Sequence, residues 1–209
     1  MAQALSINRT LVRLNLSGNC VAAEGGVQLG EALTRNNVLT ELSLAHNSIG
    51  DEGAFSLAEA LKLPTNALAM LDIGYNQIGA RGAKALAGAL RHQRGHSRSA
   101  SFCATVRHRH NAFSSKPRPA EGQDSPCAEE KAAGGSLHLC LAGNVISSDG
   151  AMALAGAIKE STRLTALNLD HNDIGHAGIT ALADAVGISS SLHELHLSGN
   201  HMGPEAAVR

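Results

Sequence analysis

The chain has 209 residues, 44% of them hydrophobic, but it contains one Tyr, three Phe and no Trp. This length allows one or two domains, and the scarcity of aromatic residues requires a core of Leu, Ile, Val and Ala. The formal net charge of −1 excludes a general electrostatic attraction to nucleic acid or an anionic membrane, and no apolar run approaches the roughly 20 residues of a membrane helix.

The first ten residues, MAQALSINRT, match the end of a later helix and its return, because QALSINRTL aligns with EALTRNNVL. The first complete unit then opens with LVRLNLSGN at residues 11–19. The same LxxLxLxxN pattern recurs as LTELSLAHN, LAMLDIGYN, LTALNLDHN and LHELHLSGN, and as SLHLCLAGN with Ser136 in place of the first leucine. Its alternating leucines are typical of one face of a short strand.

Each copy is followed by apolar residues with helical spacing. Aliphatic side chains stand two, ten and fourteen residues after the asparagine in the complete units, and a glycine stands six residues after it. Apolar positions three and four residues apart indicate one face of a helix. We expect the glycine to permit a tight entry into that helix. Each unit is therefore predicted to be strand, turn, helix and return.

The repeated unit resembles the leucine-rich repeat family, in particular its ribonuclease-inhibitor-like class with units of about 28 residues. The resemblance covers residues 1–90 and 136–209. It implies an α/β leucine-rich repeat solenoid, a horseshoe of about six strand–helix units with a parallel sheet on the concave face and helices on the convex face. Stacking is required because one unit cannot bury its apolar face alone.

Residues 91–135 interrupt the register and show neither period, so we predict a flexible, disordered insertion. Its first part, residues 91–118, has six Arg and one Lys without an acid, and the acids follow it. This part is the only candidate for nucleic-acid contact, which we do not expect because no nucleic-acid-binding fold adjoins it. The alternatives are a solvated insertion and translated non-coding sequence.

The predicted domains are therefore 1–90, with a partial first unit and three repeats, the insertion 91–135, and 136–209, with two repeats and a truncated last unit. Both ends fall within a unit, and repeat arrays normally carry terminal caps. A fragment of a larger protein, or an incomplete gene model, is the hypothesis that accounts for these ends.

The cysteines and histidines do not form a predicted catalytic or metal site. Cys140 and His196 share a row of the sheet but lie two strands apart, about 9–10 Å, whereas a nucleophile and its base need about 3 Å. His138 and Cys140 lack further zinc ligands, and the HRH at residues 108–110 falls in the insertion. Walker, HExxH and GxSxG motifs are absent. We predict no enzyme activity, no cofactor and no metal.

The four cysteines show no CxxC spacing and follow no signal peptide. This usage is typical of reduced thiols in a cytosolic or nuclear protein, and we predict a cytoplasmic location. The cysteines are Cys20, Cys103, Cys127 and Cys140.

The predicted binding surface is the concave sheet face with its rim. Residues six, four and two positions before each asparagine are expected to face outward there, and the residue just before the asparagine stands at the rim. The predicted protein-binding residues are Arg13, Asn15, Glu41, Ser43, His46, Met70, Asp72, Tyr75, Asn168, Asp170, His171, Glu194 and His196. Tyr75, the only tyrosine, is the best candidate for an interface anchor.

The resemblance further implies that the repeated asparagines form a structural ladder, with their amides bonded to backbone groups of the turns. These asparagines are Asn19, Asn47, Asn76, Asn144, Asn172 and Asn200. We assign them no chemistry.

The resemblance implies a non-enzymatic protein-interaction module or scaffold that binds a protein partner on the concave face. One version is the sensing or regulatory repeat region of a NOD-like receptor-type protein, which IGDEGAFSLAEAL at residues 49–61 resembles. Another is a cytoskeletal or axonemal scaffold. The alternative class is a GTPase-activating regulator of the Ran-specific type, for which Arg13 and Arg81 are the only basic candidates near turns or strands in the first three repeats. We expect no membrane insertion.

Overall fold

Strands and helices alternate along the part of the chain that the computed structural model describes, residues 1–92 and 135–201. The strands are β1 (Arg13–Asn15), β2 (Glu41–Ser43), β3 (Met70–Asp72), β4 (Leu137–Cys140), β5 (Leu164–Asn168) and β6 (Glu194–His196). The helices are α1 (Ala2–Ile7), α2 (Ala23–Arg35), α3 (Gly50–Lys62), α4 (Ala80–His92), α5 (Ser148–Ile158) and α6 (His176–Val186).

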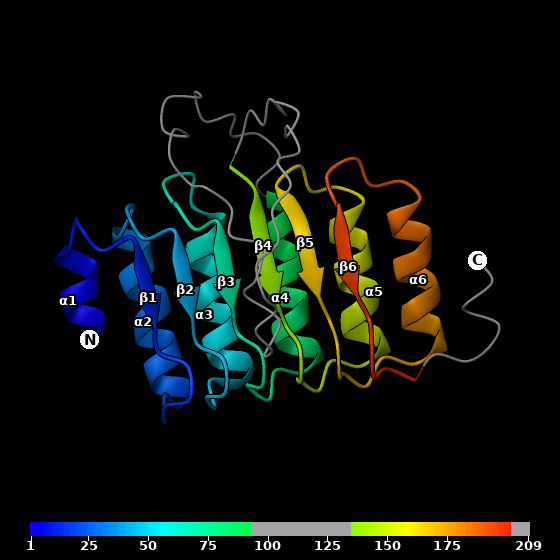
Figure 1. Cartoon of the computed structure of the whole chain (residues 1–209), viewed down its shortest axis with the longest axis horizontal. Helices are drawn as coiled ribbons and strands as arrows, with labels where there is room; N and C mark the ends of the chain where they lie inside the picture. The colour runs from blue at the N-terminus through cyan, green and yellow to red at the C-terminus, as the bar shows by residue number, and fades with distance from the viewer. Residues whose placement is uncertain (93–134, 202–209) are drawn as a thin grey trace, which may run out of the picture.

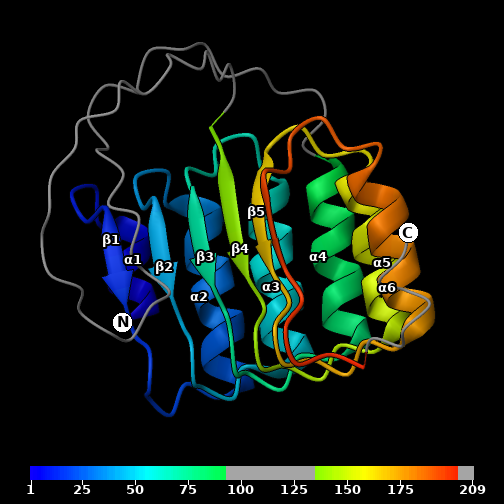
Figure 2. The same ribbon diagram turned by 45° about the vertical axis from the view of Figure 1, so that its right-hand side comes forward.

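The strands form one parallel sheet of six in sequence order, from β1 to β6. The sheet makes one layer and the helices make a second layer behind it (Figure 1). In the turned view the strands follow one another along one side of the molecule, with the row of helices along the other (Figure 2). The predicted α/β solenoid with a parallel sheet is thereby confirmed.

The sheet is continuous across the predicted insertion. Met70 of β3 is opposite His138 of β4, and Asp72 is opposite Cys140. Helix α4 extends to His92, two residues past the predicted end of the first repeat block. Residues 93–134, which make up nearly all of the predicted flexible segment, lie outside the described residues.

The core lies between the two layers and is aliphatic. Leu71 of β3, Ile78 of the following turn and Leu86 of α4 are each 0% exposed, and the other units repeat this arrangement. Within the described ranges, every buried hydrophobic residue is Leu, Ile or Ala, apart from Cys140. The described valines, also predicted for the core, are half-buried or exposed. Burial of apolar area stabilises the stack by roughly 25 cal/mol per Å².

The repeated glycine has a packing role that differs from the turn role predicted for it. Gly150 lies inside α5, where a Cβ atom would come within 2.9 Å of Ile146 Cγ2 and 3.0 Å of Ala83 Cβ. A Cβ at Gly82 would come within 2.6 Å of Ile78 Cγ2. The absence of a side chain therefore lets each helix approach its own turn and the preceding helix.

Candidate protein-binding face

The strand register places the predicted surface residues in parallel rows. The first row is Arg13, Glu41, Met70, His138, Ala166 and Glu194. The middle row is Asn15, Ser43, Asp72, Cys140, Asn168 and His196. Two positions later in each unit, the third row is Ser17, Ala45, Gly74, Ala142, Asp170 and Ser198. Residues far apart in the sequence thus share one face.

Polar side chains of the middle row hold the turn at the end of their own strand. Oδ1 of Asn15 accepts a hydrogen bond from the backbone N–H of Ser17 at 2.8 Å, and Asn168 accepts one from Asp170 at 2.8 Å. Asp72 accepts from the N–H of Gly74 at 3.1 Å. An Asx side chain bonded two residues ahead stabilises a turn, so these three residues have a structural role as well as a place on the face.

Hydroxyl groups connect the first three units across the sheet. The Oγ atoms of Ser17 and Ser43 are 2.6 Å apart, and Ser43 donates to Oδ2 of Asp72 at 3.2 Å. In the first row, Arg13 Nε lies 2.9 Å from Glu41 Oε1. This half of the face is therefore connected by interactions between neighbouring units. Met70 is half-buried between the polar groups, whereas Glu194 and His196 are exposed at the other end.

The rim position has the same backbone conformation in every unit. His46, Tyr75 and His171 have φ angles of 53°, 56° and 54°. The equivalent residues of the other units are Gly18, Gly143 and Gly199, with φ angles of 68°, 64° and 70°. Since this left-handed region costs a residue with a side chain roughly 1–2 kcal/mol, glycine is the usual occupant. Three ring-bearing residues therefore occupy positions where glycine is favoured.

Two of the rim rings form a stack. The ring centroids of His46 and Tyr75 are 4.2 Å apart, and the planes are inclined by 8°. The Tyr75 ring lies over Gly143 of the next unit, since a Cβ at Gly143 would overlap it. His171 has the same relationship to Gly199. Tyr75 remains 44% exposed.

Cys140 does not have the properties of a catalytic nucleophile. Burial, followed by the negative charge of Asp72, raises the pKa of its thiol to about 12. A thiol with that pKa is protonated near neutral pH, whereas the thiolate is the reactive species. The register also separates Cys140 from His196 by β5, as predicted, because Asn168 lies opposite both.

Metal and membrane sites have equally little support in the described chain. No cluster of three or more His, Cys, Asp or Glu residues that could hold a metal ion occurs within residues 1–92 and 135–201. The HRH motif at residues 108–110 lies outside those ranges. Among the described helices, none is long and apolar enough to cross a membrane.

Six segments of the chain match a family model described as a leucine-rich repeat. The matched residues are 8–30, 35–58, 70–87, 137–155, 160–183 and 189–208. The chain belongs to the leucine-rich repeat family. No curated protein matches this chain.

Two solved structures have a similar fold. The structure of leiomodin-1 actin-binding site 2 is 15% identical, with a TM-score of 0.51, and the match covers 99% of this chain and 81% of that one. The Caenorhabditis elegans tropomodulin C-terminal domain is 14% identical, with a TM-score of 0.50, and the match covers 99% of this chain and 84% of that one. At these identities the likeness shows the leucine-rich repeat fold alone.

The leucine-rich repeat asparagines lie one above another along the stack. Asn144 donates to the carbonyl oxygens of Ile73 in the preceding unit (3.1 Å) and Leu141 in its own unit (2.9 Å). Its Oδ1 accepts from the N–H of Ile78 at 2.9 Å. Corresponding bonds to the preceding unit are made by Asn47, Asn76, Asn172 and Asn200. Among the described residues, the exposed Asn19 bonds only within its own unit. The asparagine side chains of the second to sixth units therefore join neighbouring units through hydrogen bonds to backbone groups.

A second polar column, at the other end of the strands, was not predicted. Asn36 is 2% exposed; it donates to the carbonyl of Leu5 at 2.8 Å and accepts from the N–H of Leu39 at 2.9 Å. Ser161 accepts from the N–H of Leu164, and Ser191 donates to the carbonyl of Ser161. The sequence signal was present, because Asn or Ser recurs just before the first leucine of several units.

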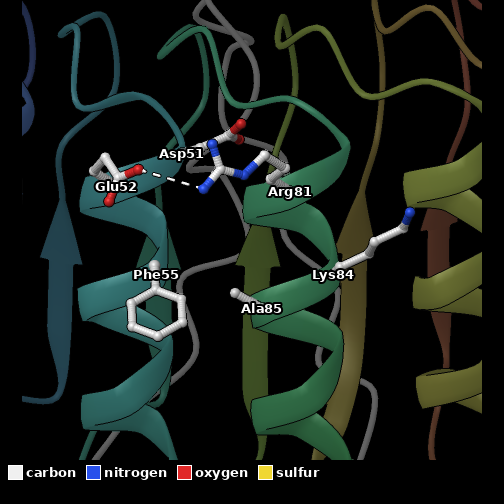
Figure 3. Close-up of a pocket in the computed structure, with 6 residues that line it drawn as sticks. All are labelled: Asp51, Glu52, Phe55, Arg81, Lys84 and Ala85. Atoms are coloured by element: carbon white, nitrogen blue, oxygen red, sulfur yellow. Dashed lines mark ion pairs between the residues drawn. The ribbon is translucent and has the colours of Figure 1, made fainter.

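Among the described residues, a shallow groove of about 420 Å³ lies on the helical side, between α3 and α4 (Figure 3). Phe55, which is 54% exposed, lies along it, and Arg81 points toward Glu52 with a nitrogen-to-oxygen distance of 3.6 Å. Asp51, at the upper end, accepts hydrogen bonds from the N–H groups of Gly79 and Gly82, both at 2.8 Å, at the start of α4. The polar groups of this groove therefore have structural partners.

The residues considered for a GTPase-activating role lie on different faces. Arg13 belongs to the sheet, where it pairs with Glu41. Arg81 belongs to α4 on the helical side, where it pairs with Glu52. The two basic side chains therefore do not form a joint site.

Proposed function

We propose that this leucine-rich repeat chain is a non-enzymatic protein–protein interaction module that binds a protein partner on its concave face. The supporting observation is the His46–Tyr75 stack, in which two rings are held parallel at 4.2 Å on left-handed backbone. Sparsely populated backbone conformations cluster at binding sites, and tyrosine is enriched in the residues that dominate interface energies. Stacked repeats also supply the extended concave surface that such proteins use.

The proposal includes the ribonuclease-inhibitor-like class. It is supported by the asparagine spacing of 28 or 29 residues within each block and by helices of 11 to 13 residues in the complete units. A NOD-like sensing or regulatory repeat region is one version of this proposal. The proposed location is the cytoplasm, which follows from the cysteine usage.

Site-specific photocrosslinking tests which face binds. Benzoylphenylalanine is introduced either at Ala45, in the third row of the sheet face, or at Ala85, on α4; both alanines are half-buried. We expect irradiation in a cell extract to give a discrete protein adduct from position 45, and we expect excess unlabelled protein to compete it away. Adducts from position 85 alone, or equal adducts from both positions, would contradict the proposal.

A cytoskeletal scaffold is the second candidate, favoured by the similarity to leiomodin-1 actin-binding site 2 over 99% of this chain. Co-sedimentation with filamentous actin is the direct test, with Tyr75→Asn as the matched variant because Asn tolerates the left-handed conformation. We expect an actin-binding chain to pellet with filaments and the variant to pellet less. Absence of the wild-type chain from the pellet would exclude filamentous actin as the partner.

A further inference from the structure

The described part of the chain consists of an N-terminal block, residues 1–92, and a C-terminal block, residues 135–201. The connection between α4 and β4 has more residues than any other connection from a helix to the following strand. β4 nevertheless follows β3 directly in the sheet (Figure 1), and the N–H of Ile73 donates to the carbonyl oxygen of Cys140 at 3.0 Å. The junction between the two blocks is therefore hydrogen-bonded like the junctions inside each block.

The helices at this junction approach each other as closely as helices within one block. A Cβ atom at Gly150 of α5 would lie 3.0 Å from Ala83 Cβ of α4. Within the C-terminal block, a Cβ atom at Gly178 of α6 would lie 3.0 Å from Ala151 Cβ of α5. Leu86 of α4 is fully buried. An interface that resembles a core cut in half is typical of permanent complexes.

Buried polar groups also join the two blocks. The amide of Asn144, which is 5% exposed, donates to the carbonyl oxygen of Ile73 at 3.1 Å, and its Oδ1 accepts from the N–H of Ile78 at 2.9 Å. Arg163, just before β5, donates from Nη2 to the carbonyl oxygen of Leu68 in the N-terminal block at 3.1 Å. Because these bonds form only when the blocks are in register, they add specificity to the apolar contact.

We propose that β3 and α4 of the N-terminal block form a docking surface for the C-terminal block, and that the two blocks stay bound to each other when the connection between them is cut. The stability of a repeat array is approximately the sum of the stabilities of its units and of the contacts between neighbours. A covalent connection as such supplies local concentration rather than contacts. Cleavage within residues 93–134 then leaves a two-chain protein with an unbroken concave face. The docking of the two blocks goes beyond the proposed function and does not rest on it.

A cut made in the folded full chain tests the docking. A recognition site for a sequence-specific viral protease is inserted between Gly122 and Gln123, and the purified chain is cleaved to completion. At about 1 μM, where permanent complexes remain assembled, we expect both fragments to elute from gel filtration together, at the volume of the uncut chain. Elution of the fragments as separate species, or precipitation of either one, would overturn the proposal.

Tyr75 reports on the junction in the same samples. It is the only tyrosine and the chain has no tryptophan, and its ring lies against Gly143 of the C-terminal block. We expect cleavage alone to leave the Tyr75 emission per molecule unchanged, and dilution of the cleaved chain to change it once the fragments separate. The concentration at the midpoint of that change measures the affinity of the blocks. A change that accompanies cleavage itself would contradict the docking.

A matched pair of arginine variants tests whether the described contacts hold the blocks together. Arg163→Lys keeps the positive charge but lacks the fork with which Arg163 donates to the carbonyl oxygens of Gly135 and Leu68. We expect it to raise the midpoint concentration about threefold or more, the net value of roughly one hydrogen bond. The control is Arg9→Lys, because Arg9 donates to carbonyl oxygens of the partial first unit; it should change the midpoint by less than about twofold, since distant sites act independently. Equal midpoints in the two variants would overturn the proposal.

A pair of asparagine variants tests the buried bonds. Asn144→Ala should raise the midpoint about tenfold, because it leaves buried backbone groups at the junction without partners. Asn47→Ala removes the equivalent bonds, to Leu16 and from Val21, between the first and second units, and should raise the midpoint less. Circular dichroism of the uncut variants shows first that each is folded, and Arg163→Lys decides where an asparagine variant is not. Equal weakening by the two asparagine variants would count against the docking surface.

These measurements contain no partner protein, so their outcome is separate from the photocrosslinking result. Fragments that separate after cleavage would overturn the docking of the two blocks and leave the proposed role of the concave face in the intact chain unaffected. Fragments that stay together while crosslinks arise only from position 85 would support the docking, and only the proposed function would be wrong.

Discussion

The ring of Tyr75 lies against the backbone of Gly143 in the next unit, in a place where position 143 has no room for a side chain. His171 and Gly199 repeat the relationship one pair of units further along. In each of these two pairs, a ring on left-handed backbone lies against a glycine that is also left-handed. The identity of one rim residue thus determines where its neighbour's ring can lie.

Gly143→Ala should displace Tyr75. The substitution places a Cβ atom on backbone with φ of 64°, which costs roughly 1–2 kcal/mol of stability, and that atom overlaps the Tyr75 ring. We expect a lower urea midpoint and an altered tyrosine emission spectrum. Gly18→Ala is the control, because φ is 68° there but nothing lies within 4 Å of the added atom. An unchanged Tyr75 emission in Gly143→Ala would contradict the described contact.

Two glycines inside helices, the repeated Gly150 of α5 and the non-repeated Gly88 of α4, predict opposite effects of alanine substitution. Gly150→Ala should destabilise the protein by about 1–3 kcal/mol, because the new methyl group overpacks against Ile146 and Ala83. Gly88→Ala in α4 should stabilise it by about 0.5–1 kcal/mol, because nothing lies within 4 Å and alanine favours the helix. Urea denaturation of both variants measures whether each substitution lowers or raises the free energy of unfolding. A loss of stability in Gly88→Ala, or none in Gly150→Ala, would argue against this packing.

The regular part of the fold could be predicted because each unit has the same apolar spacing. Leu71 of β3 and the asparagine that follows the strand have counterparts in register in every unit, so this one pattern predicts the strands, their order and the face that Asp72 shares with Ser43. What could not be predicted depends on contacts between units. His46 stacks on Tyr75, and the Tyr75 ring lies against Gly143. Both contacts depend on backbone angles and ring orientations, which the spacing of residues in the sequence does not specify.

The sequence also did not predict that a side chain of one unit caps the helix of the next unit, because such a cap depends on a contact between units. Asp51 is in the first turn of α3, where an acid is expected to favour its own helix dipole, but its carboxylate accepts hydrogen bonds from Gly79 and Gly82 at the start of α4. Ser148 has the same place in its unit and accepts from the N–H of Gly175 before α6. The spatial neighbour, rather than the sequence neighbour, determines this role.

Asp51→Ala should therefore destabilise the start of α4, although the substitution lies in α3. Losing a capping side chain costs about 1 kcal/mol, and hydrogen exchange of the Gly79 and Gly82 amides should become faster. Glu52→Ala is the control, because that residue is the next one along α3 and has only an exposed ion pair with Arg81, worth less than about 1 kcal/mol. Equal exchange rates at Gly82 in both variants would show that Asp51 is not the cap.

Cys140 predicts a specific loss of stability in alkaline solution. Burial and the charge of Asp72 raise the pKa of its thiol from 9.0 to about 12 in the folded chain. The folded state therefore holds the thiol proton more tightly than the unfolded state. The corresponding stability is fully present below pH 9.0 and is lost as the pH rises toward about 12.

The expected slope is about 1 kcal/mol of unfolding free energy between about pH 9 and about pH 10. Other groups also titrate in this range, so the decisive quantity is the difference between the wild-type chain and Cys140→Ala, each unfolded with urea at both pH values. The variant should have a lower stability at pH 9 because it leaves a small cavity, but it should lose less on going to pH 10. Parallel losses in the two proteins would mean that the thiol at position 140 ionises as readily in the folded chain as in the unfolded one.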